Sequence, residues 1–378
     1  MKSFIFQGLV FWVICSFQVA VASSVEPVTA IVGAKVFDGT GNKPEVKTIV
    51  ISGNIVVSMG NNIDVPSGAT VIDARGEALL PGLYDLHSHW ISSGNSSTIP
   101  QIAAAYVTHG VTFVNDFNEP PEAYEPLRKW LNTLVAPHVS FAARISTPGG
   151  HGADWGDQST TKWVNNTESA KAAIAAIMPY KPDLIKAFTD GWRYGTSPDN
   201  TSMDGTTLAA VVASAHAHHL KVLTHTVTVD RGLIAAEAGV DSLAHIMQDR
   251  ELKSEEVQKI KCTGMSVIPT LSVYDPYEDK SGHTFDVTSL SRIKKFERAL
   301  YNVKLLYEAG VRIGVGTDAG MPSTPHGQST LHELELLVKA GLTPQQALIA
   351  ATADSASIMV ILLVMGRFMW VPRLTSFL

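Results

Sequence analysis

Two patterns of hydrophobic positions divide the chain. In the first, short runs of β-branched residues alternate with turns that contain Gly, Asn or Asp, as in VTAIVGAKVFDGTG, KTIVISGNIVVSMG and GATVIDARG. Runs of this kind, bounded by turn residues, are typical of short β-strands. The pattern therefore predicts a small β domain over residues 23–77.

In the second pattern, short apolar runs alternate with longer segments of helical periodicity. The expected strands are ALLPGLYDLH, VTFVNDF, VSFAARIS, DLIKAFTD, KVLTHT, DSLAHIM, MSVIPTLS and VRIGVGTD, and the expected helices include TESAKAAIAAIM and TTLAAVVASAHAHHL. Eight strand–helix units over about 270 residues match the size of a (β/α)8 TIM barrel. A doubly wound sheet is the competing α/β arrangement, but no glycine-rich dinucleotide turn follows the first strand. We predict a barrel over residues 78–357.

The N-terminus departs from both patterns. Lys2 precedes an apolar run, Phe4 to Phe17, which is followed by the small-residue triplet Ala-Val-Ala. This order is typical of a cleaved signal peptide, and the run is shorter than the ~20 apolar residues of a membrane anchor. We expect a signal peptide at residues 1–22 and a periplasmic or extracellular protein without stable membrane insertion.

Composition narrows the classes of partner. The 378 residues are 45% hydrophobic and 17% charged, with a formal net charge of −6. No basic stripe or long charge run is present, so we expect no nucleic-acid partner. A small-molecule substrate is the partner expected, and assembly into a homo-oligomer stays open. Cys262 is the one cysteine outside the signal region, which leaves no internal disulfide.

Polar residues interrupt the apolar strands at their carboxyl ends. His87 and His89 end the first strand, and their spacing of two lets both side chains face one metal ion. We expect Asp85 on the same face, as a supporting partner. The fourth, fifth, sixth and eighth strands carry Lys186, His225, His245 and Asp318. Because carboxyl ends converge on one face of a barrel, and buried charge is costly unless paired or metal-bound, the set predicts a metal centre.

Several motifs resemble those of the amidohydrolase superfamily. PGLYDLHSH looks like its first-strand signature and VGTDAG like its eighth-strand signature. TPGGHG, the fourth-strand lysine, IPTLSVYD and HGQSTLHELELLVKAGLTPQQAL are most similar to its imidazolonepropionase-like and prolidase-like branch. The resemblance implies two divalent metal ions, with zinc favoured over manganese, cobalt or iron. His87, His89 and Asp318 would hold the more buried metal, and His225 and His245 the more exposed one.

The resemblance also implies a mechanism. Carboxylated Lys186 would bridge the two metals, because an ammonium group has no lone pair to donate. A metal-bound hydroxide would hydrolyse a C–N bond in an amide, a cyclic amide or a dipeptide-like substrate. Asp318 would carry the proton to the leaving nitrogen.

Three further residues are candidates for substrate binding. His151 in GGHG would bind the substrate carbonyl or stabilise the oxyanion, with a role in loop structure as the alternative. Arg144 and Tyr274 would contact a substrate carboxylate, although Arg144 could instead pair with an acid inside the barrel. The alternatives for the whole chain are a phosphotriesterase- or lactonase-like esterase on the same metals and a non-catalytic truncated remnant.

The C-terminus departs from the family pattern. Family members continue with a glycine-rich turn and strands that return to the N-terminal sheet, whereas residues 358–378 read IMVILLVMGRFMWVPRLTSFL. We interpret this segment as a divergent hydrophobic tail. The β-sandwich-type N-terminal domain is then expected to lack its usual C-terminal strands, with reduced stability as the consequence.

Overall fold

The computed structural model describes residues 26–90, 96–153, 158–191, 200–277 and 287–359. The predicted signal peptide lies outside these ranges, as do residues 360–378 of the predicted tail. No helix in the described ranges is long and apolar enough to cross a membrane.

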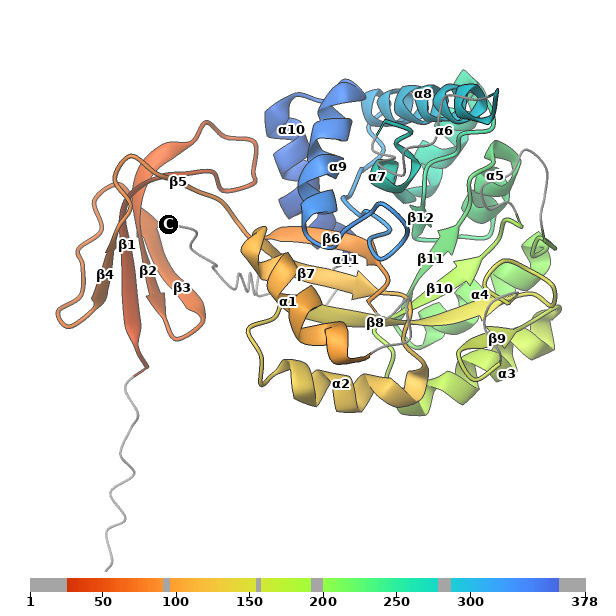
Figure 1. The fold of residues 1–378 in the computed structure, drawn as a ribbon, viewed down its shortest axis with the longest axis horizontal. Coiled ribbons are helices and arrows are strands. Elements are labelled where there is room, and N and C mark those ends of the chain that lie inside the picture. Colours follow the sequence, from red (N-terminus) through yellow and green to blue (C-terminus); the bar gives the residue numbers. More distant parts are fainter. Residues whose placement is uncertain (1–25, 91–95, 154–157, 192–199, 278–286, 360–378) are drawn as a thin grey trace, which may run out of the picture.

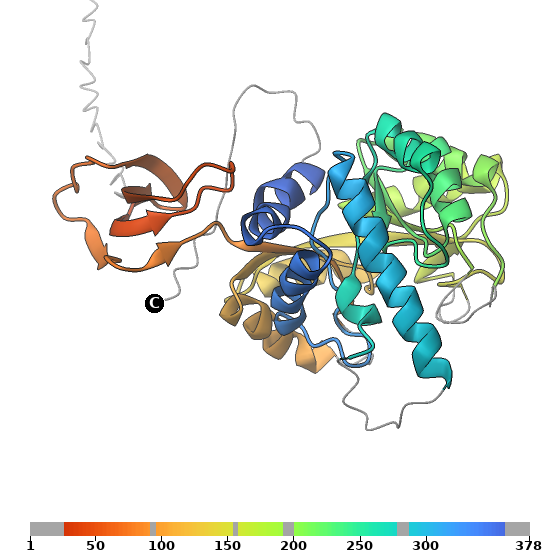
Figure 2. The same cartoon turned by 90° about the horizontal axis from the view of Figure 1, so that it is seen from above.

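The N-terminal strands form a small sheet of their own, seen beside the barrel in Figures 1 and 2. Its order is β3-β2-β1-β4, with β5 also paired to β1. The strands are β1 (Val28–Val36), β2 (Glu45–Ser52), β3 (Ile55–Gly60), β4 (Thr70–Asp73) and β5 (Ala78–Leu79). Ile31 and Ile49 are directly paired and buried, whereas Ile55, Val57 and Met59 of β3 are exposed. This sheet therefore keeps apolar side chains in contact with solvent.

Seven parallel strands build most of the barrel, in the order β13-β12-β11-β10-β8-β7-β6. They are β6 (Leu83–Ser88), β7 (Val111–Asp116), β8 (His138–Ser146), β10 (Leu184–Phe188), β11 (Lys221–His225), β12 (Ser242–Ala244) and β13 (Ser266–Ile268). A short strand, β9 (Thr161–Trp163), pairs with the end of β8. Each barrel strand coincides with a segment that the apolar pattern predicted, except that β6 runs one residue further, to Ser88, and β8 begins one residue earlier, at His138.

The segment expected as the eighth strand closes the barrel through isolated backbone hydrogen bonds rather than a continuous ladder. Residues 311–319 lie between β13 and β6, where Gly314 N donates to Val267 O (2.9 Å) and Leu86 N donates to Val315 O (2.8 Å). At Gly316, a Cβ atom would lie 2.5 Å from Ile268 Cγ2 and 2.9 Å from the backbone nitrogen of His87. A residue without a side chain is therefore needed for this segment to pack against both neighbours. The predicted (β/α)8 barrel is confirmed.

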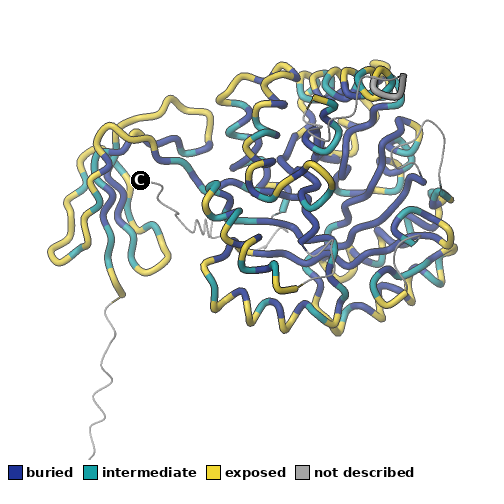
Figure 3. Tube along the Cα trace, in the orientation of Figure 1, coloured by how far each residue is buried: buried dark blue, intermediate teal, exposed yellow. Residues whose placement is uncertain are grey.

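Helices surround the strands (Figures 1 and 2). They are α1 (Ile99–Thr108), α2 (Tyr124–Leu131), α3 (Thr167–Ile177), α4 (Gly205–Ala217), α5 (Val229–Glu237), α6 (Ser254–Thr263), α7 (Leu271–Tyr274), α8 (Val287–Glu308), α9 (Gln328–Lys339), α10 (Pro344–Ile349) and α11 (Ser355–Met359). The apolar faces of helices α1 to α10 pack on the outer faces of the strands, and the barrel strands are buried almost throughout in Figure 3. A separate cluster fills the interior, where Ile358 of α11 packs with Leu86 and Leu184. The interior is thus a packed core beneath the strand ends.

Candidate metal centre

Three predicted ligands meet at the carboxyl ends of the first and eighth strands. His87 Nε2 lies 3.2 Å and His89 Nε2 lies 2.9 Å from the same oxygen, Asp318 Oδ1. One ligand atom from each residue lies within 4.8 Å of the other two, and all three side chains are buried. The structure therefore brings His87, His89 and Asp318 together as the sequence predicted for the more buried metal.

Backbone bonds between the two strands set this arrangement. Asp318 N donates to His87 O (2.8 Å), and His89 N donates to Ala319 O (2.7 Å). Asp318 adopts a φ of 63°, a left-handed conformation that is uncommon for a residue with a side chain. Such backbone strain persists only where the surroundings hold it, and it clusters at functional sites.

The expected orientation of Asp85 is wrong. Its carboxylate accepts hydrogen bonds from Thr330 Oγ1 of α9 (3.1 Å) and from Tyr106 Oη of α1 (3.4 Å), so it faces the helices rather than the metal cluster. The pairing of β6 with β7 shifts register between Asp85 and Ser88, and such an irregularity breaks the simple alternation of side chains. Asp85 still supports the site, because it also accepts from the backbone nitrogen of Thr317 (3.1 Å).

The remaining three predicted ligands adjoin the first cluster. Lys186 Nζ lies 3.2 Å from His87 Nε2, and the His87 and His245 rings are 4.6 Å apart between centroids. The ring centroids of His225 and His245 are also 4.6 Å apart. Residues from the fourth, fifth and sixth strands therefore line the same end of the barrel as His87.

The loop after the third strand places His151 over this group. The His151 ring lies 4.4 Å from that of His225 and 5.1 Å from that of Phe188. Gly152, with a φ of 83°, allows this approach, because a Cβ there would lie 2.7 Å from the Phe188 ring. His151 is thus close enough to contact a substrate held by the histidine cluster.

The two candidates for a substrate carboxylate differ in their surroundings. The Tyr274 ring meets the His245 ring edge-on, 5.6 Å away. Arg144 is buried beside Lys186 in the sheet, where burial lowers its pKa and the nearby Asp116 and Glu119 oppose that shift. Burial raises the pKa of Asp116 to about 6 and that of Glu119 to about 8, so near pH 7 Asp116 is the acid of this pair that carries a charge beside Arg144.

Burial controls protonation in the cluster. It lowers the pKa of His87 to about 3 and that of His245 well below its ordinary value. Burial also lowers the pKa of Lys186 to about 7, against a smaller opposing effect of Asp318. The imidazoles of His87 and His245 are consequently neutral near pH 7, the form in which histidine binds metals.

The chemistry of this donor set fits a divalent metal ion. Imidazole nitrogens and carboxylate oxygens are ordinary ligands of zinc. The Nδ1 atoms of His87 and His89 are buried and, among the described residues, have no hydrogen-bond partner. Without a metal, the polar contacts of these two rings among the described residues are those of the Nε2 atoms, with Asp318 Oδ1 and, for His87, also with Lys186 Nζ.

Sequence reasoning missed two residues around the centre. The Thr270 hydroxyl lies 2.6 Å from His245 Nδ1, and the Phe117 ring lies 4.6 Å from that of His87. Thr270 follows the seventh strand, which carries no predicted ligand, so its place in IPTLSVYD was the available signal. Phe117 comes directly after β7, and in the sequence it cannot be distinguished from an ordinary core residue.

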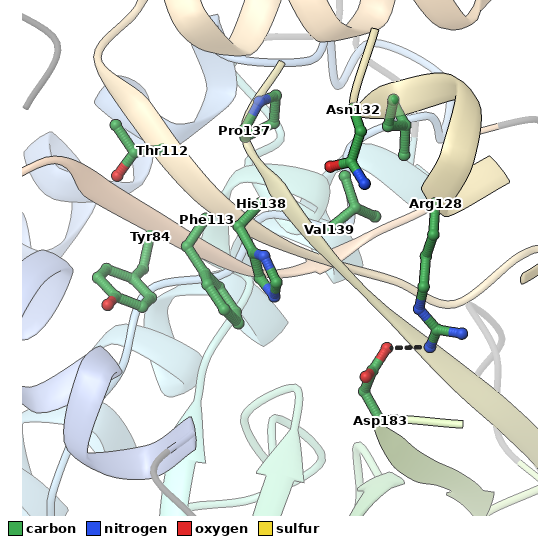
Figure 4. A pocket seen from close by; sticks show the side chains of 10 residues that line it. Tyr84, Thr112, Phe113, Arg128, Asn132, Pro137, His138, Val139 and Asp183 are labelled. Carbon is green, nitrogen blue, oxygen red and sulfur yellow. Dashed lines mark hydrogen bonds and ion pairs between the residues drawn. The ribbon is translucent and has the colours of Figure 1, made fainter. Parts of the chain in front are cut away.

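A separate cavity of about 530 Å³ lies at the other end of the strands (Figure 4). Tyr84, Phe113 and His138 line it near the starts of β6, β7 and β8, and Arg128 forms an ion pair of 2.7 Å with Asp183 at its edge. None of the predicted site residues borders this cavity. Active sites of TIM barrels lie at the carboxyl ends of the strands, so the histidine cluster is the better candidate.

Comparison with known proteins agrees with this geometry. A model of the amidohydrolase family matches residues 78–361, more than half of the chain. The chain belongs to the amidohydrolase family. Members of this family are hydrolases that act on carbon–nitrogen bonds, and the chain is an enzyme of that class.

Individual relatives of this amidohydrolase cover most of its length. Ochratoxinase from Aspergillus niger is 25% identical, over 87% of this chain and 76% of the relative. The structure of A. niger ochratoxinase matches with a TM-score of 0.75 and 21% identity, over 89% of this chain and 85% of that one. A Xaa-Pro dipeptidase with bound methionine in the active site matches with a TM-score of 0.74 and 23% identity, over 88% of each chain. These two structures share the fold.

Proposed function

We propose that this amidohydrolase is an exported, metal-dependent enzyme that hydrolyses an amide, cyclic amide or dipeptide-like bond. The observation that carries the proposal is the convergence of His87, His89 and Asp318 on one point, with Lys186 and two further histidines beside them. The names of the relatives support the same chemistry, since they include a Xaa-Pro dipeptidase and an ochratoxinase.

The residues present allow two metal positions. His87, His89 and Asp318 would hold the more buried ion, and His225 and His245 the more exposed one. Lys186, carboxylated at Nζ, would bridge them; its amine is within reach of the first position, 3.2 Å from His87 Nε2. Bound metals would supply hydroxide near neutral pH and polarise the scissile carbonyl.

The side chains of the protein would perform the remaining steps. Asp318 is the one carboxylate in contact with both His87 and His89 among the described residues, and it would take the proton of the attacking water and deliver it to the leaving nitrogen. His151 would donate a hydrogen bond to the developing oxyanion. Tyr274 would contact the substrate beside His245, and Arg144 would contact a substrate carboxylate only to the extent that Asp116 leaves its charge available.

A hydrolysis screen tests this function. The chain from residue 23 onward is incubated with dipeptides, N-acyl amino acids, cyclic amides, lactones and phosphotriesters, before and after treatment with a chelator. We expect turnover of one of the C–N substrates that the chelator abolishes and added metal restores. Turnover of esters alone would favour the esterase alternative, and no turnover of any class would favour the non-catalytic one.

Export is tested separately from catalysis. The proposed cleavage site follows the Ala-Val-Ala triplet and precedes Ser23. Expressed from its first residue in a host with a secretory pathway, the protein should be recovered outside the cytoplasm, and N-terminal sequencing should begin at Ser23. Recovery of the intact N-terminus in the cytoplasm would contradict the proposal.

A further inference from the structure

Glu333 of α9 is a buried carboxylate that the proposed mechanism does not use. It has no exposed surface, and it accepts hydrogen bonds from Leu271 N (2.8 Å), Ser272 N (2.7 Å) and Ser272 Oγ (2.7 Å). These two backbone nitrogens belong to the first turn of α7, where N–H groups have no acceptor within their own helix. Glu333 thus fixes the start of α7 from a neighbouring helix.

The segment fixed in this way carries two contacts to the metal centre. Thr270, immediately before α7, adopts a left-handed φ of 50° and places its hydroxyl 2.6 Å from His245 Nδ1. Tyr274, at the end of α7, packs edge-on against the ring of His245. A β-branched residue is held in this conformation only when its surroundings require it, and the bonds from Glu333 begin at the very next residue.

The contact with Thr270 decides how His245 can act. When Nδ1 carries the ring proton and donates it to the hydroxyl, Nε2 keeps its lone pair and is free to bind a metal. A hydrogen bond to the second nitrogen also fixes the orientation of a ligating imidazole. His245 itself has a φ of 111°, so its backbone does not rest in a favourable conformation that would hold the ring without help.

We infer that Glu333 is a positioning residue for the more exposed metal position: it holds the turn at residues 270–274, through which Thr270 sets the tautomer and orientation of His245. The inference rests on the proposed metal-dependent function. In this inference, the contact between α9 and α7 positions His245 and Tyr274. Other residues position the cluster of His87, His89 and Asp318.

That other support lies one turn earlier on the same helix. Thr330 is also fully buried, and its hydroxyl donates to Asp85 Oδ2 (3.1 Å). Asp85 in turn accepts from Thr317 N and from Thr317 Oγ1 (2.7 Å), directly before Asp318. Helix α9 therefore braces the two metal positions through separate residues, which provides a matched comparison.

Metal titration of the metal-free protein tests the inference without relying on activity. Cobalt binding is followed by visible absorption, with bound metal counted by mass spectrometry, for the wild type and the variants E333A, E333Q, T270A and T270S. We expect two binding steps in the wild type. E333A and T270A should weaken one step by roughly 10–100-fold, the usual effect of losing a partner behind a metal ligand. T270S, which keeps the hydroxyl, should bind metal in that step with wild-type affinity. The affinity of E333Q in that step should lie between those of the wild type and E333A.

Control variants separate positioning from general damage. Q328A changes an exposed side chain at the start of the same helix and should bind both metals like the wild type. T330V should weaken the step that E333A leaves intact. A folded E333A that binds both metals within threefold of the wild type would overturn the inference. If E333A does not fold, T270A decides, and unchanged binding there would overturn it equally. A wild type that binds no metal would instead refute the proposed function.

Discussion

At the scale of single residues, the site depends on one oxygen atom shared by two imidazoles. Asp318 Oδ1 lies 3.2 Å from His87 Nε2 and 2.9 Å from His89 Nε2, and burial keeps the pKa of His87 low. In the proposed function, this carboxylate both binds a metal and moves a proton. A substitution that preserves its shape but removes its charge separates this role from packing.

The variant D318N should lose most of its activity while staying folded. An amide can neither accept the proton of the attacking water nor return it to the leaving nitrogen, so kcat should fall by roughly 10²–10⁴-fold. Steady-state kinetics on the best substrate of the screen measures this effect. Glu251→Gln, at an exposed position, is the control. A kcat for D318N within threefold of the wild type would remove Asp318 from the proton transfer.

At the scale of elements, the apolar pattern predicted the barrel strands well because each is a short buried run. The predicted ligands could be chosen because His225, His245 and Asp318 follow such runs directly. The orientation of Asp85 could not be predicted, since it depends on a register shift between β6 and β7 that leaves no mark on either strand alone. Thr270 was missed for a similar reason: its role depends on a contact between two strand ends distant in sequence.

The closing segment of the barrel should not tolerate a methyl group at Gly316. In G316A, the new Cβ would lie 2.5 Å from Ile268 Cγ2 and 2.9 Å from the backbone nitrogen of His87, so the segment that carries Asp318 must move. Overpacking of this kind costs about 1–3 kcal/mol of stability. The free energy of unfolding, measured with denaturant, and the metal content should both be lower in G316A than in the wild type. Gly205→Ala, at the start of α4 with one contact at 3.3 Å, should have little effect. Equal losses in both variants would contradict this account.

Glu333 should also make stability depend on pH. Burial raises its pKa from 4.5 to about 7, so between these values the folded chain keeps a proton that the unfolded chain releases. The free energy of unfolding therefore falls as pH rises through this window. Relative to E333Q, which cannot ionise, the wild type should lose stability between about pH 4.5 and 7 and run parallel to it outside that range. Urea unfolding of both proteins at several pH values measures the difference, and parallel curves throughout would refute the shift.

At the scale of the whole molecule, the sequence predicted a barrel preceded by a small sheet, and the structure has both. The hydrophobic tail lies mainly outside the described residues, so its interpretation stays a prediction. The small sheet is less completely buried than the barrel, since Ile55 and Val57 are each 56% exposed on β3. Exposed apolar side chains on a strand favour association between molecules.

Replacing these two side chains should improve solubility without changing catalysis. In the double variant I55T/V57T, the strand keeps β-branched residues but presents hydroxyl groups to solvent. We predict a higher concentration or temperature at the onset of aggregation, measured by light scattering, with kcat and KM unchanged because β3 lies in a different sheet from the metal centre. A double variant that aggregates at the same point as the wild type would show that this surface does not drive association.

The central claim is that six side chains from the ends of five strand segments hold metal at the mouth of the barrel. Its most direct test is the metal content of the purified chain from residue 23 onward, measured by mass spectrometry after extensive dialysis. A two-metal centre of the kind used by hydrolases requires about two divalent ions per chain. That is the result we predict, and fewer than about one ion per chain, even after incubation with zinc, manganese, cobalt or iron, would contradict the account.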